Sequence, residues 1–82
     1  TPVFATSPGT ISAAGWAGGY GLLVEVNHGP SVQTRYGHLS QIHVAPGQSV
    51  RAGDLLGLVG STGRSTGPHL HYEVRAHGQA ID

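Results

Sequence analysis

The residues best suited to chemistry in this chain are two histidines, His69 and His71, separated by a single leucine. In a β-strand, residues two apart project from the same face, so a strand over this segment would place the two imidazoles side by side. Imidazole is the commonest metal-ligating side chain and a frequent general acid or base. The pair therefore indicates a metal site or a catalytic site. The alternative is chance placement on a solvated strand, because the chain has six histidines.

A third candidate, His38, lies in the segment Tyr36-Gly37-His38-Leu39-Ser40, where a predicted strand meets a loop. Strand ends on a rigid scaffold often carry functional side chains. Alone, His38 would be interpreted as an exposed turn histidine, but three imidazoles in two such settings favour a site. Glu73 shares a predicted strand face with His69 and His71, so it either supports an imidazole or is a solvated acid, and we favour the second. No role is assigned to the remaining histidines, His28, His43 and His77.

The composition excludes several classes of function. Four basic and four acidic residues give a formal net charge of zero, so the chain has no basic patch for nucleic acid. No apolar stretch approaches the roughly 20 residues that span a bilayer. The chain contains no cysteine, so a metal would be held by imidazole and carboxylate groups, a donor set that suits zinc.

The elements that must position these histidines are short strands. Fourteen glycines and five prolines divide the chain, and β-branched, alternating segments lie between them. A tight turn at residues 28–31 predicts a hairpin, and turn signals bracket residues 49–51. We predict one all-β domain, sandwich-like or barrel-like, with short glycine-rich turns. The predicted strands are 3–5, 9–16, 22–27, 32–38, 42–44, 55–59 and 68–74.

Residues 44–57 are also similar to the glycine-turned β segments of lipoyl- and biotinyl-carrier domains. Those domains attach their cofactor to a lysine, and this chain contains none. The carrier function is therefore excluded, whereas a related β architecture stays open.

Four segments resemble the lysostaphin-like (LytM-type) zinc metalloendopeptidases: residues 36–40, 44–50, 53–54 and 60–74. Residues 13–21 and 24–26 fit the same pattern, so the resemblance covers nearly the whole chain. It implies antiparallel sheets that form an open groove, related to the barrel-sandwich hybrids. It also implies a Zn²⁺-dependent endopeptidase that acts outside the cytoplasm on bacterial peptidoglycan, at a cross-bridge or a stem-peptide crosslink.

The resemblance also implies roles for the three histidines. His71 falls on the zinc ligand of the family's His-x-His motif. His69 and His38 fall on histidines that line the catalytic water, as a general base or as stabilisers of the transition state. This agrees with the chemistry expected of a zinc-bound water beside neighbouring imidazoles.

One part of the family pattern is missing from the chain. The other two zinc ligands belong to a His-x-x-x-Asp motif expected before Thr1, yet no such motif is present and no histidine precedes His28. We therefore expect residues 1–82 to be a single, partial catalytic domain without its N-terminal metal-ligand segment, inactive and weakly zinc-binding on its own. The intact His-x-His motif favours an enzyme as the parent. The alternatives are a non-catalytic module that binds peptidoglycan or activates hydrolases, and a β-rich structural piece with solvated histidines.

Overall fold

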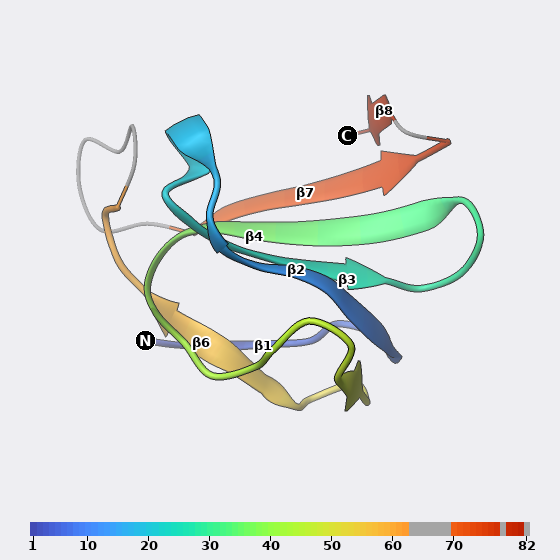
Figure 1. The fold of residues 1–82 in the computed structure, drawn as a ribbon, viewed down its shortest axis with the longest axis horizontal. Helices are drawn as coiled ribbons and strands as arrows, with labels where there is room; N and C mark the ends of the chain where they lie inside the picture. Colours follow the sequence, from blue (N-terminus) through green and yellow to red (C-terminus); the bar gives the residue numbers. More distant parts are fainter. Residues whose placement is uncertain (63–69, 78, 82) are drawn as a thin grey trace.

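The computed structural model describes residues 1–62, 70–77 and 79–81. The regular elements of these described residues are eight strands and one 3-10 turn, η1 (Gly18–Tyr20); Figure 1 shows their arrangement. None of the described elements is a helix of the length and apolarity that crossing a membrane requires. The strands are β1 (Pro2–Phe4), β2 (Gly9–Trp16), β3 (Leu22–Asn27), β4 (Val32–Ile42), β5 (Ser49–Val50), β6 (Leu55–Val59), β7 (His71–Ala76) and β8 (Gln79–Ile81).

All strand pairs are antiparallel, and the main path through the sheet runs β1-β6-β4-β3-β2-β5. One edge of β4 pairs with β3. The other edge of β4 is shared by two strands. Its first part, Val32–Gly37, pairs with β7, and its last part, from Leu39 to Ile42, pairs with β6. The sheet curls around this division, so that β1 and β6 lie apart from the β7-β4-β3-β2 layer (Figure 1).

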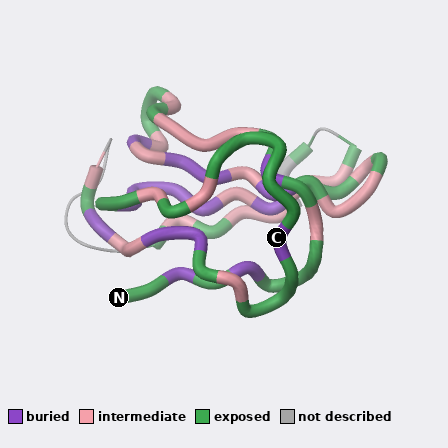
Figure 2. The backbone as a smooth tube through the Cα atoms, turned by 60° about the horizontal axis from the view of Figure 1, so that its bottom comes forward, coloured by how far each residue is buried: buried purple, intermediate pink, exposed green. Residues whose placement is uncertain are grey.

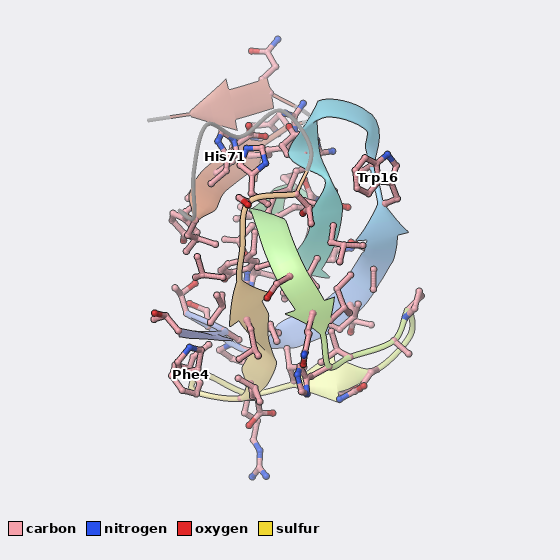
Figure 3. All side chains as sticks on the ribbon, turned by 90° about the vertical axis from the view of Figure 1, so that its left-hand side faces the viewer. Phe4, Trp16 and His71 are labelled. Carbon is pink, nitrogen blue, oxygen red and sulfur yellow. The ribbon has the colours of Figure 1, made fainter. Side chains whose placement is uncertain are left out.

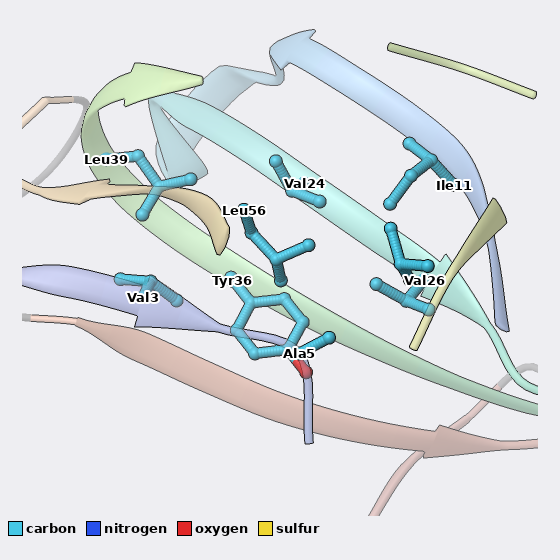
Figure 4. Close-up of a cluster of buried hydrophobic side chains, with 9 residues drawn as sticks. Val3, Ala5, Ile11, Val24, Val26, Tyr36, Leu39 and Leu56 are labelled. Carbon is cyan, nitrogen blue, oxygen red and sulfur yellow. The ribbon is translucent and has the colours of Figure 1, made fainter. Parts of the chain in front are cut away.

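The apolar core fills the inside of this curl. Buried stretches alternate with exposed ones along the chain, and most connecting turns are exposed (Figure 2). Side chains from six strands meet in the core, with Leu56 of β6 facing Val24 and Val26 of β3 (Figure 4). The buried cluster comprises Val3, Ala5, Ile11, Val24, Val26, Tyr36, Leu39, Val50 and Leu56. Burial of these side chains is the main force that closes the sheet on itself.

The all-β, antiparallel prediction is confirmed. The predicted strands 9–16, 22–27 and 55–59 match β2, β3 and β6, and the hairpin at residues 28–31 joins β3 to β4. Strand 3–5 is displaced by one residue from β1. Strand 68–74 overlaps β7, which ends two residues later; residues 68 and 69 lie outside the described part of the chain.

One prediction about the strands is wrong, and one strand was missed. The loop predicted between residues 38 and 42, with a separate strand at 42–44, is instead the continuous end of β4, because β6 supplies hydrogen-bonding partners for residues 39–42. Strand β8 was not predicted at all. Its three residues have no alternating pattern of their own, and they become a strand by pairing with β7.

The contact between β4 and β6 depends on a residue without a side chain. A Cβ atom added to Gly57 would overlap the carbonyl oxygen of Gln41 across the ladder. We expect Gly57→Ala to lower the free energy of unfolding by about 1–3 kcal/mol, as overpacking does. Gly29→Ala is the matched control, because a Cβ there meets nothing within 4 Å. Urea denaturation would measure both, and equal effects would contradict this account of the interface.

Candidate active site

A pocket of about 290 Å³ lies where β4, β7 and the turn η1 meet, and it is lined by Gly19, Tyr20, His38, His71 and Glu73. Figure 3 shows His71 at the same end of the molecule as Trp16, the residue that ends β2 shortly before η1. Two of the three histidines predicted to carry chemistry therefore line one pocket. The third, His69, lies outside the described residues.

An irregularity in β4 gives His38 its orientation. Leu22 pairs with Leu39 and Val24 with Tyr36, so two steps along β3 correspond to three along β4. The extra residue is a β-bulge, a feature that bends a strand and redirects its side chains. His38 adopts φ 59° there, in the left-handed region that few residues other than glycine visit. The bulge brings the His38 ring to 5.9 Å from that of His71, in an edge-to-face arrangement.

The His38 ring is held by a backbone carbonyl. Its Nδ1 lies 2.6 Å from the carbonyl oxygen of Thr62. A carbonyl oxygen only accepts hydrogen bonds, so Nδ1 carries the proton and the neutral ring has its lone pair on Nε2. Thr62 is fixed in turn, because its hydroxyl donates to the Leu39 carbonyl at 2.6 Å and accepts from the Leu22 amide at 3.0 Å. One threonine thus determines both the position and the tautomer of the imidazole.

His71 begins β7 and lies opposite Gly37 of β4. Tyr20 packs edge-on against the His71 ring, with 5.5 Å between the ring centroids. The absence of a side chain at residue 37 leaves room for this approach. A Cβ on Gly37 would lie 3.2 Å from Cδ1 of Tyr20 and 3.5 Å from Cβ of His71. The glycine therefore permits a close aromatic contact at the wall of the pocket.

Glu73 is the centre of a polar cluster behind His71. Its carboxylate accepts from Arg75 at 2.8 Å and from the Tyr20 hydroxyl at 3.1 Å, and it lies 3.4 Å from Nε2 of His71. Arg35 is 4.0 Å away and also contacts the Tyr20 hydroxyl. With its side chain only 16% exposed, Glu73 is not the solvated acid that the sequence suggested.

The same cluster lowers the pKa of two carboxyl groups. The hydrogen bond from Arg75 lowers the pKa of Glu73 below its ordinary 4.5; burial opposes this, and the bonds from His71 and Tyr20 add to it. Burial raises the pKa of Glu25, but the bonds from Ser12 and Arg35 outweigh burial and leave that pKa lowered too. Both side chains are therefore carboxylates at neutral pH.

Sequence reasoning missed Tyr20 as a site residue, although it lies in a conspicuous glycine-rich segment, Gly18-Gly19-Tyr20-Gly21. An aromatic residue between glycines was the available signal. Nearby, Glu25 pairs with Arg35 at 2.6 Å. Away from the pocket, Asp54 stabilises its own turn by accepting from the Arg51 amide at 2.8 Å. The histidines that received no role, His28, His43 and His77, do not line the pocket.

The described residues supply few donors for a zinc ion. A catalytic zinc ordinarily has three protein ligands. Among residues 1–62, 70–77 and 79–81, no group of three or more His, Cys, Asp or Glu side chains is placed to hold a metal ion. His71 offers one suitable imidazole, but the described residues do not by themselves complete a zinc site.

Comparison with known proteins defines the class to which this fold and pocket belong. The model of peptidase family M23 matches residues 1–82. The chain therefore belongs to peptidase family M23, and the resemblance inferred from its motifs is confirmed.

Two curated relatives illustrate the range of this family. The DD-carboxypeptidase/endopeptidase Mpg of Neisseria meningitidis serogroup B is 52% identical over 82 residues, which are the whole of this chain and 19% of that protein. The murein hydrolase activator EnvC of Escherichia coli is 42% identical over 82 residues, again the whole chain and 20% of that protein. The chain thus spans about a fifth of the length of these relatives.

Solved structures share the fold across the whole chain. A zinc-containing peptidase from Vibrio cholerae superposes with a TM-score of 0.95 at 38% identity, and the chain covers 25% of it. The catalytic domain of lysostaphin from Staphylococcus simulans gives a TM-score of 0.92 at 39% identity, with 66% of that domain covered. The curled antiparallel sheet is therefore that of the lysostaphin-like peptidases.

The clamp formed by Thr62 can be tested by removing its hydroxyl. Thr62→Val leaves the Leu22 amide and the Leu39 carbonyl without this partner, so we expect the free energy of unfolding to fall by about 1–3 kcal/mol. Thr62→Ser keeps the hydroxyl and is expected to retain most of that stability. Chemical denaturation of both variants measures the difference. If valine and serine behave alike, the hydroxyl does not hold this segment.

The lowered carboxyl pKa values predict a pH dependence of stability. In the unfolded chain the carboxylates of Glu25 and Glu73 take up protons near pH 4.5, whereas in the folded chain they do so only at lower pH. The contribution of these groups is therefore complete above that pH and is lost as the pH falls through their folded pKa values. Denaturation midpoints measured from neutral pH down to about pH 3 should decline, and Glu25→Gln should reduce the decline. A midpoint that rises on acidification would contradict this prediction.

Proposed function

We propose that the protein containing this chain is a zinc-dependent endopeptidase that hydrolyses peptide bonds in bacterial peptidoglycan, in a cross-bridge or a stem-peptide crosslink, outside the cytoplasm. The observation that carries the proposal is the meeting of His38 and His71 in one pocket of an M23 family chain. Two further facts support it: Mpg is named an endopeptidase, and the similar peptidase from Vibrio cholerae contains zinc.

In this proposal His71 is a zinc ligand, and His38 and His69 are the catalytic histidines. Residues 1–82 form part of the catalytic domain, and the remaining zinc ligands come from outside the described residues. Zinc, when bound, supplies a Lewis acid and lowers the pKa of bound water.

The geometry of His38 suits a residue that moves a proton. With Nδ1–H donating to the Thr62 carbonyl, Nε2 is the atom that can accept a proton. Once the ring is charged, the same hydrogen bond strengthens, because charge-assisted bonds are stronger than neutral ones. Thr62 therefore stabilises the imidazolium that proton transfer would produce.

A second candidate function is a non-catalytic module that activates other wall hydrolases. The observation that favours it is the 42% identity to the murein hydrolase activator EnvC. An activator would stimulate a separate hydrolase without cleaving the wall itself. The two functions are therefore separable in one assay.

The test is digestion of purified peptidoglycan by the intact protein, with released peptides measured by chromatography. We expect a chelator to abolish cleavage and added zinc to restore it. His38→Ala should lower the rate by about 10²–10⁴-fold, the usual contribution of a general acid or base. His71→Ala should abolish cleavage. His43→Ala is the control, because the His43 ring contacts Gln41 and does not line the pocket.

Cleavage that survives His71→Ala would overturn the proposed site. Failure of the intact, zinc-loaded protein to cleave, together with stimulation of a separate wall hydrolase, would favour the activator.

A further inference from the structure

The polar cluster around Glu73 determines which nitrogen of His71 carries a proton. Nε2 of that ring lies 3.4 Å from Oε2 of Glu73. An ionised carboxylate accepts hydrogen bonds and donates none, so the imidazole must donate through Nε2–H. A neutral imidazole with its proton on Nε2 has its lone pair on Nδ1. The contact therefore selects Nδ1 as the nitrogen that can bind a metal ion or accept a proton.

Glu73 is itself held in place from several sides. The Tyr20 hydroxyl lies 3.1 and 3.2 Å from its two oxygens, and Arg75 donates to Oε1 at 2.8 Å. Arg35 lies 4.0 Å from the same oxygen. Both guanidinium groups lie at Oε1, so Oε2 is the oxygen that faces His71. The two positive charges also keep the carboxylate ionised. The orientation of His71 thus depends on a side chain that is already fixed.

Tyr20 contacts both His71 and Glu73. Its ring packs edge-on against the His71 ring, and its hydroxyl bonds to the carboxylate of Glu73. The guanidinium of Arg35 lies 5.6 Å from the Tyr20 ring centroid and donates to its hydroxyl at 3.2 Å. The tyrosine is therefore anchored at its hydroxyl while its ring limits rotation of the imidazole.

We propose that Glu73 and Tyr20 are positioning residues that hold His71 as the Nε2–H tautomer and leave Nδ1 as its ligating atom. The assignment of Nδ1 as a metal-ligating atom rests on the proposed function. The tautomer itself is a property of the metal-free protein and can be measured without any substrate.

The experiment uses the intact protein, freed of metal, labelled with ¹⁵N-histidine and held at a pH where the ring is neutral. Long-range proton–nitrogen correlation spectra report which nitrogen carries the proton, and His71→Gln identifies the His71 signals. We expect wild type to show the Nε2–H pattern alone. Glu73→Ala should lose this single pattern and show a mixture of both tautomers.

Two variants separate positioning from simple damage to the fold. Tyr20→Phe keeps the ring against His71 and removes only the hydroxyl, so we expect a smaller shift toward the mixture. Glu73→Gln keeps a carbonyl oxygen that can accept from Nε2–H, and it should retain most of the wild-type pattern. The control is Asp54→Asn, a carboxyl group that accepts from the Arg51 amide and does not line the pocket; its spectrum should match wild type.

An unchanged His71 pattern in Glu73→Ala, or an Nδ1–H pattern in wild type, would overturn the inference. These outcomes are distinguishable from failure of the proposed function. Wild-type protein that cleaves peptidoglycan while Glu73→Ala leaves the tautomer unchanged would refute only the positioning role. Wild-type protein that does not cleave, but whose His71 pattern is lost in Glu73→Ala, would refute only the function.

Discussion

Hydrogen bonding along β4 is the constraint on which the rest of the structure depends. Among the described strands it has three partners, since β3 lies along one edge and β7 and β6 share the other. The change of partner falls at residues 37–39, and the bulge falls at the same place. The sheet curls there, the core closes beneath it, and His38 turns toward His71. The fold and the pocket therefore have a common geometric origin.

The ion pairs around Glu73 contribute little to the free energy of unfolding. Partly exposed ion pairs such as that of Arg75 with Glu73 add only about 0–1 kcal/mol each, because solvent screens them and ordering the side chains costs entropy. Their effect on orientation is larger. A carboxylate held by two guanidinium groups and a tyrosine has few positions available, so the imidazole it contacts also has few. The cluster therefore serves mainly to define the geometry of the pocket.

The sequence predicted those parts of the molecule that depend on local patterns. Alternation located β2, β3 and β6 because each buries one face, and the His-x-His and Tyr-x-His-Leu-Ser segments pointed to His71 and His38. The sequence did not predict that β4 continues past His38. That part of the strand forms by pairing with β6, which is distant in the sequence. Tyr20 was missed for a similar reason. Its partner Glu73 lies 53 residues away, and no local pattern connects them.

The backbone of His38 links these observations. A non-glycine residue at φ 59° costs energy, of the order of 1–3 kcal/mol, and such residues cluster where the surrounding structure holds them for a purpose. Here the ladders with β3, β6 and β7 hold the strand on both sides of the bulge, and the Thr62 carbonyl holds the ring. Glycine would relieve the strain but would remove the imidazole. Under the proposed function, this strained and buried histidine, fixed in one tautomer beside a second histidine, has a reason to be there: the reaction needs an imidazole at the pocket, whereas the core and the sheet do not.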